Sequence, residues 1–159
     1  MRARQILLVG LSSIFFILCA KNEDKYIPQA IKEFTLVKKI DGEEAREFIN
    51  RLHLNQVAPQ NNEIAFYKSG HKEMTLYLTH YQSRSLAEED WQRMVKKISP
   101  ENSVFIGGEV IELDGRQVYR CYGMGQTHFV FVDENVLIWF STPTVGSDDW
   151  FRAYSSFLN

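Results

Sequence analysis

The spacing of apolar residues along the chain predicts three helices. In residues 41–54, apolar side chains recur at helical intervals and form one stripe: Ala45, Phe48, Ile49 and Leu52. Asp41 followed by Glu44 is typical of a helix start, and Ser85 followed by Glu88 predicts the same at the beginning of a second helix, residues 85–99. Residues 148–159 give a third amphipathic pattern, which we expect Ser147 to cap.

Between these helices the apolar period shortens to that of strands. Residues 63–81 alternate about Ser69-Gly70, which predicts a hairpin with its turn at the glycine. Four further strands are predicted, at 103–113, 116–124, 126–132 and 135–142. Asp114-Gly115 predicts a tight turn between the first two of them, and Gly107-Gly108 predicts a bulge. Residues 34–40 are short and apolar enough for a strand or for the lead-in to the first helix.

These elements predict an α+β fold. The expected order is αββαββββα, with a mainly antiparallel sheet of about six strands and with the helices packed on one face. The chain is then divided into a signal peptide or N-terminal anchor (1–19), a polar tether (20–33) and a single globular domain (34–159).

The composition and net charge limit the classes of partner that the protein is expected to bind. The chain has 159 residues, of which 45% are hydrophobic and 24% charged, values that are ordinary for one globular domain. Its net charge is −2; loss of residues 1–18 would remove two of the 18 basic side chains, Arg2 and Arg4, and leave 16 against 20 acidic ones, or −4. A mildly acidic domain lacks the basic footprint of a nucleic-acid-binding protein, so we expect no nucleic-acid partner.

The N-terminus carries the most specific signal in the sequence. A basic start (MRARQ) precedes an uncharged run, residues 6–20, that ends around Cys19 and is followed by charged residues. The run is shorter than the about 20 apolar residues of a membrane span but long enough for a secretory signal. It resembles the signal peptide of bacterial lipoproteins, which implies acylation of Cys19. That class usually has leucine and a small residue where Phe16 and Leu18 stand here.

Two other fates of the segment remain open. A general signal peptidase would cut after Ala20, or the segment would stay uncut as a short anchor. All three fates place residues 21–159 outside the cytosol, in the cell envelope facing the periplasm or the exterior. Acylation of Cys19 and an uncut segment would also hold the chain at the membrane, and on these two fates we expect a membrane partner through a lipid or an anchor.

The residues that usually carry chemistry show no strong catalytic motif. The four histidines, His53, His71, His80 and His128, have no zinc-binding spacing, so no metal or other cofactor is expected. His80 and His128 lie in predicted strands and could meet across the sheet, where two imidazoles would transfer a proton or bind a metal. Cys121 lies in an apolar strand and is expected to be a buried free thiol.

The glycines of residues 121–128 (CYGMGQTH) resemble a phosphate loop, but a strand rather than a helix follows, so we interpret them as a hairpin. Tyrosines alternate with polar residues in the same strands. If the face opposite the helices were bare, it would present an aromatic surface to a partner or small ligand. His80, His128, Arg120 and Tyr122 are the predicted ligand-binding residues of this face.

These observations favour a membrane-tethered exported domain without catalytic activity, which binds a protein or small ligand or serves a structural role. The alternative is an exported hydrolase that uses His80 or His128. A deep pocket holding both histidines would favour the enzyme.

Overall fold

The computed structural model describes residues 24–53, 61–98 and 104–159, which form eight strands and three helices. The strands are β1 (Ala30–Ile31), β2 (Phe34–Asp41), β3 (Asn62–Ser69), β4 (Lys72–His80), β5 (Ile106–Leu113), β6 (Arg116–Gly123), β7 (Gln126–Asp133) and β8 (Val136–Pro143). The helices are α1 (Gly42–His53), α2 (Arg84–Ile98) and α3 (Ser147–Leu158).

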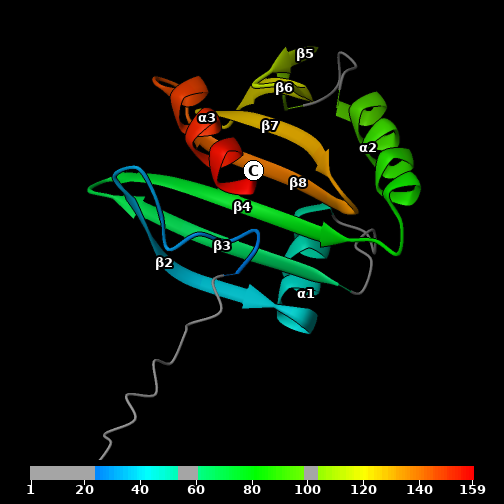
Figure 1. The fold of residues 1–159 in the computed structure, drawn as a ribbon, viewed down its shortest axis with the longest axis horizontal. Coiled ribbons are helices and arrows are strands. Elements are labelled where there is room, and N and C mark those ends of the chain that lie inside the picture. Colours follow the sequence, from blue (N-terminus) through cyan, green and yellow to red (C-terminus); the bar gives the residue numbers. More distant parts are fainter. Residues whose placement is uncertain (1–23, 54–60, 99–103) are drawn as a thin grey trace, which may run out of the picture.

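All eight strands belong to one antiparallel sheet in the order β1-β2-β3-β4-β8-β7-β6-β5 (Figure 1). Two-residue turns join β3 to β4 and each neighbouring pair from β5 to β8, which explains why consecutive strands are antiparallel neighbours. The two halves of the sheet meet where β4 pairs with β8, with Leu76 opposite Phe140. The Gly107-Gly108 bulge is confirmed, because the pairing of β5 with β6 shifts between Ile106 and Glu109.

Helices cover both faces of the sheet. On one face, Phe151 and Tyr154 of α3 are fully buried in a core that also contains Leu76 and Phe140. The other face has two smaller cores, one under α1 and one under α2. These two helices share a face, because Tyr77 in the α1 core lies directly opposite Trp139 in the α2 core. Figure 1 shows α3 in front of the sheet and α1 behind it.

The predicted fold is therefore wrong in two respects. The sheet has eight strands rather than about six, and helices pack on both of its faces. The added strands are β1 and β2, so the element order is ββαββαββββα. Residues 34–40, which suited a strand or a helix lead-in, form a strand because β3 offers a complete pairing edge, with Ile40 opposite Ile64.

The helix caps also differ from those predicted. The second helix begins at Arg84, and the hydroxyl of Ser83 accepts a hydrogen bond from the Leu86 amide at 3.4 Å, so Ser83 rather than Ser85 lies at its start. The third helix follows Gly146, whose φ of 90° is left-handed, and no side chain caps it. Ser147 is thus the first helical residue and not the cap.

Residues 24–31, which the sequence assigns to the tether, pack against the α3 face of the sheet. Tyr26, Ile27 and Ile31 are buried there, and Ile31 lies opposite Phe34 in the short β1–β2 pairing. Two buried tyrosines hold this segment through its backbone: Tyr67 donates to the carbonyl of Pro28 and Tyr154 to that of Tyr26, both at 2.9 Å. Residues 24–31 are therefore part of the fold.

Candidate functional site

The two histidines that were expected to meet lie on opposite faces of the sheet. His80 lies on the same face of the sheet as Leu78, which is the face that α3 covers. His128 lies on the other face, which α2 covers. Their positions along the strands also differ, since His80 is level with Val136 of β8 and His128 with Ser141. Five residues of strand correspond to about 17 Å. The prediction that they pair is wrong.

His128 is a buried, hydrogen-bonded residue of the core. Its Nε2 lies 3.0 Å from the carbonyl of Gly123, so this nitrogen carries the proton and donates. Nδ1 accepts from the Trp139 indole at 3.1 Å and lies 2.9 Å from the hydroxyl of Ser141. Burial lowers the pKa of His128 below its usual value. The neutral ring therefore joins β7 to β8.

The contact between Ser141 and His128 has the composition of a nucleophile and its base. Both side chains are buried, at 4% and 1% exposure, and the ring of Phe105 packs edge-on against His128 with centroids 4.9 Å apart. Cys121, directly opposite His128, is a buried free thiol as predicted, and burial raises its pKa to about 11. Neither the hydroxyl nor the thiol is accessible to a substrate in this arrangement.

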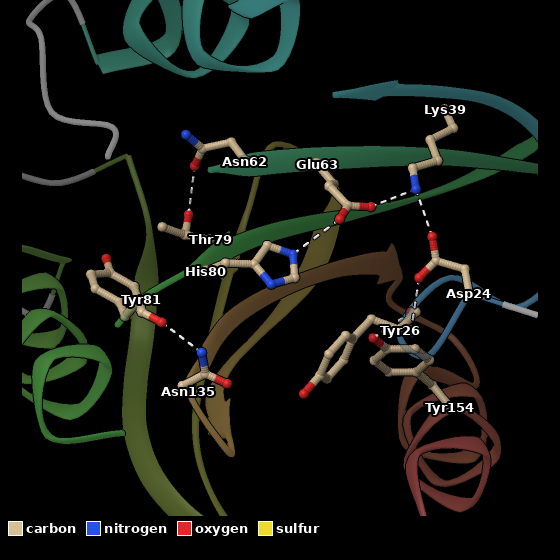
Figure 2. A network of polar contacts seen from close by, with 10 residues as sticks. All are labelled: Asp24, Tyr26, Lys39, Asn62, Glu63, Thr79, His80, Tyr81, Asn135 and Tyr154. Carbon is tan, nitrogen blue, oxygen red and sulfur yellow. Dashed lines mark hydrogen bonds and ion pairs between the residues drawn. The ribbon is translucent and has the colours of Figure 1, made fainter. Parts of the chain in front are cut away.

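His80 belongs to an ionic network at one end of the sheet (Figure 2). Its Nε2 lies 3.1 Å from the carboxylate of Glu63, within ion-pair distance although not aligned as a hydrogen bond. The other Glu63 oxygen lies 2.6 Å from the Lys39 ammonium, which also contacts Asp24 at 2.6 Å. The ring of Tyr26 packs edge-on against the imidazole, with centroids 5.9 Å apart. This network fastens the start of the described chain to β2, β3 and β4.

The contacts decide the charge states in this network. The His80 contact is the largest influence on Glu63, and with Lys39 it lowers the carboxyl pKa to about 2 despite partial burial. Burial alone would lower the pKa of Lys39, but its contacts with Asp24 and Glu63 outweigh that effect and raise it. Glu63 is therefore an anion at neutral pH, held between two basic groups.

Arg120 and Tyr122 are brought together, as successive side chains on the α3 face of β6. The guanidinium lies 5.9 Å from the centroid of the tyrosine ring, within cation–π range. It also pairs with Glu109 of β5 at 2.5 Å and approaches Asp148 of α3 at 3.6 Å. The Glu109 hydrogen bond raises the pKa of Arg120. Of the four predicted ligand-binding residues, only these two share a site, and it is on the face opposite His128.

Next to this pair, apolar side chains gather on the surface. We define the β5 corner by Val104, Ile106 and Met124, each 72% exposed. Ile106 lies opposite Tyr122 across β5 and β6, and Met124 occupies the turn that follows β6. Contiguous exposed apolar side chains of this size mark interaction surfaces more often than isolated ones do.

Local packing explains why these side chains point outward. Phe105 is directed inward onto His128, so its neighbours Val104 and Ile106 are left at the surface. Gly123 makes room for Phe105, because a Cβ there would lie 2.6 Å from the phenylalanine ring. The apolar pattern of the sequence did not lead us to expect this corner. The available signal was the run of three apolar residues before the Gly107-Gly108 bulge, which one buried face cannot accommodate.

An open groove of about 500 Å³ runs beside α1 on the opposite face. Its apolar lining includes the edge-on pair Phe48 and Phe66. Two lysines of the groove are paired with its own carboxylates, for example Lys38 with Glu44 at 3.3 Å. The groove therefore offers fewer unpaired charged groups to a ligand than its residue types suggest. Another hollow, of about 440 Å³, lies between α2 and the strands β6 and β7 and is largely polar.

No protein-family model matches this sequence, and no curated protein or solved structure is significantly similar to it. Among residues 24–53, 61–98 and 104–159, no helix is both long and apolar enough to cross a membrane. Within the same ranges, no three histidine, cysteine, aspartate or glutamate side chains are grouped as metal ligands. Cys19 and the apolar N-terminal run lie outside the described residues, and so do the side chains of Leu52 and His53. His71 is exposed in the turn between β3 and β4.

Proposed function

We propose that this protein is a membrane-tethered domain of the bacterial cell envelope, facing the periplasm or the exterior, which binds another protein without catalysing a reaction. The observation that carries the binding role is the β5 corner, where three large apolar side chains are exposed next to Arg120 and Tyr122. An aromatic ring and an arginine beside an apolar surface are typical of binding hot spots.

The tether is supported by the way the chain enters the fold. Five residue steps separate Cys19 from Asp24, a reach of at most about 18 Å. Asp24 is then fixed by Lys39, and Lys25 contacts Glu134 in the turn between β7 and β8 at 2.5 Å. An acylated Cys19 would therefore hold this end of the sheet close to the membrane surface.

The β5 corner lies at the opposite end of the sheet. The entry contacts reach Glu134, after the last residue of β7, whereas Met124 precedes the first residue of β7. Eight strand residues separate the two ends by about 27 Å. This placement favours a protein partner in the compartment beyond the membrane over insertion of the corner into the lipid.

Site-specific photocrosslinking in the producing cells tests the binding role. A photoreactive amino acid at Ile106 is expected to give one discrete adduct, whose partner mass spectrometry identifies. Val37, 52% exposed on β2 near the other edge of the sheet, is the matched control and is expected to give none. Equal adducts from both positions, or none from Ile106, would remove the support for a binding surface at the corner.

One contact keeps the enzymatic alternative open for His80, though not for the buried His128. Glu63 lies 3.1 Å from Nε2 of His80, so a carboxylate is placed to orient this imidazole. In the hydrolase triad the carboxylate pairs with Nδ1, so here the two ring nitrogens would exchange roles and Nδ1 would be the base. Hydrolysis of an activated ester such as p-nitrophenyl acetate discriminates the two functions. The binding role predicts the same rate for the parent and His80→Gln, whereas a large loss in the variant would favour an exported hydrolase.

A further inference from the structure

The outer edge of β5 is available for backbone pairing. β5 is the last strand in the sheet order, so one of its two edges has no neighbouring strand among the described residues. A two-residue turn closes the β5–β6 hairpin after Leu113, which makes Leu113 and Arg116 a hydrogen-bonded pair. Because bonded and non-bonded pairs alternate, the N–H and C=O groups of Val110 and Glu112 are directed away from β6.

The other edge of the sheet is protected against such pairing. Its last strand, β1, has two residues, and β2 beside it carries a bulge between Leu36 and Lys38. Lys38 and Lys39 follow that bulge, and edge lysines and bulges both discourage strand addition. The β5 edge instead presents Val110 and Ile106 as exposed apolar residues. The two edges therefore differ in the features that decide whether a further strand can add.

We propose that the β5 edge binds an extended segment of a partner protein as a ninth strand, and that this segment alternates apolar with basic residues. The proposal rests on the proposed binding function and specifies its partner. Main-chain hydrogen bonds to Val110 and Glu112 supply affinity, and alternate side chains supply specificity. On one face of β5 the partner's basic side chains meet Glu112, and on the other face its apolar side chains meet Ile111 and Ile106.

The charges of β5 select a basic partner. Glu112 is exposed, and among residues 24–53, 61–98 and 104–159 no cation lies within ion-pair distance of it. Glu109 is half exposed and faces Arg120. Pairing of β5 with the β5 of a second copy would place the Glu112 carboxylates of both chains on the same face of the joined strands. Like charges on adjacent strands are destabilising, so a foreign basic strand is favoured over self-association.

Binding of a model peptide to the full chain in detergent micelles tests this proposal. The probe is a fluorescein-labelled octapeptide of alternating valine with lysine or threonine, and the control peptide has glutamate in place of lysine. We expect the basic peptide to bind at least about tenfold more tightly than the acidic one. Amide hydrogen exchange of Val110 and Glu112 should slow in the complex, because their N–H groups become bonded.

Two variants separate backbone pairing from side-chain contact. Val110→Pro removes an outward N–H without removing a bond to β6, and we expect at least about a tenfold loss of affinity. Val110→Thr keeps the N–H and should bind within about twofold of the parent. Glu112→Lys should reverse the preference between the two peptides, and circular dichroism checks that each variant is folded.

Several results would overturn the inference. The first is no binding of the basic peptide at about 1 mM, a concentration that corresponds to a binding free energy of about 4 kcal/mol. The second is equal affinity of Val110→Pro and Val110→Thr for the peptide. The third is slowed hydrogen exchange at amides outside β5. A discrete photocrosslink at Ile106 together with any of these results would leave the binding role standing and reject strand addition alone. Loss of the Ile106 crosslink while the peptide still binds would reject the binding role in cells.

Discussion

The carboxylate of Glu63 is the centre of the network that attaches the entry segment, and Glu63→Gln is its most informative perturbation. The amide keeps the shape of the side chain but removes the charge that faces both His80 and Lys39. Lys39 retains Asp24 in the variant. The substitution therefore tests the electrostatic contribution with little change in packing.

The expected loss of unfolding free energy follows from the lowered pKa of Glu63. A fall from 4.5 to about 2 corresponds to about 3–4 kcal/mol at most, at about 1.4 kcal/mol per pKa unit. The Glu63 side chain is 23% exposed, so solvent screening reduces this value. We expect Glu63→Gln to lower the free energy of unfolding by about 1–2 kcal/mol at pH 7.

The lowered pKa of Glu63 also determines how the stabilisation changes with pH. Because the folded-state pKa is below the unfolded one, the stabilisation is complete above about pH 5 and is lost as the pH falls towards 2. Urea unfolding of parent and variant from pH 7 to pH 2.5 should show a gap that narrows over the acidic part of this range. The control is Glu73→Gln, which breaks an exposed pair with Lys68 and should cost less than about 0.5 kcal/mol.

A gap between parent and Glu63→Gln that stays constant with pH would refute this reasoning, because the loss would then come from packing. Equal losses in Glu63→Gln and Glu73→Gln would refute it as well, since the half-buried network would contribute no more than a surface ion pair.

Three other predictions concern the β6–β7 region. Gly123→Ala should lower stability by about 1–3 kcal/mol in thermal unfolding, because the new Cβ would meet Phe105 at 2.6 Å and the Val104 carbonyl at 3.0 Å; an unchanged midpoint would contradict this packing. The lowered pKa of His128 means that the unfolded chain binds its proton first, so stability falls as the pH drops below about 6.5, and His128→Gln should reduce that loss between pH 7.5 and 5.5 in urea unfolding. Cys121 should react with a thiol reagent at least about 100-fold faster in denaturant than in the native protein, and similar rates would contradict its burial.

Local turn chemistry was readable from the sequence. Asp114-Gly115 forms the turn after β5, and both residues have positive φ values, of 54° and 74°. The turn at Gly70 and the bulge at Gly107 were predicted for the same reason, since glycine adopts such conformations without a Cβ penalty. These features depend on one or two residues each and require no knowledge of distant contacts.

The prediction that helices cover only one face of the sheet was wrong, although the sequence contained a signal for burial on both faces. β7 and β8 are nearly continuous apolar runs, HFVFV and VLIWF, and such runs are typical of strands that are buried on both faces. Helices on one face alone would have left half of these side chains exposed. The strand β2 gave a weaker signal, because its lysines interrupt the alternation, and the edge strand β1 is too short to show a period.

The candidate site depended on register, which connects residues distant in sequence. Arg120 and Tyr122 are two residues apart on one strand, so a shared face could be predicted from the sequence alone. His80 and His128 are related only through β8, and their separation follows from the pairing of β4 with β8. The exposure of Ile106 likewise depends on which way Phe105 turns.

We propose that the chain is exported and held at a membrane by its N-terminus. The decisive measurement is the intact mass of the native protein isolated from the membrane fraction of the producing cells. We predict a chain that begins at Cys19 and carries additional acyl mass, which Cys19→Ser lacks. A chain found in the cytosol with Met1 and residues 6–20 intact would show that the protein is neither exported nor anchored.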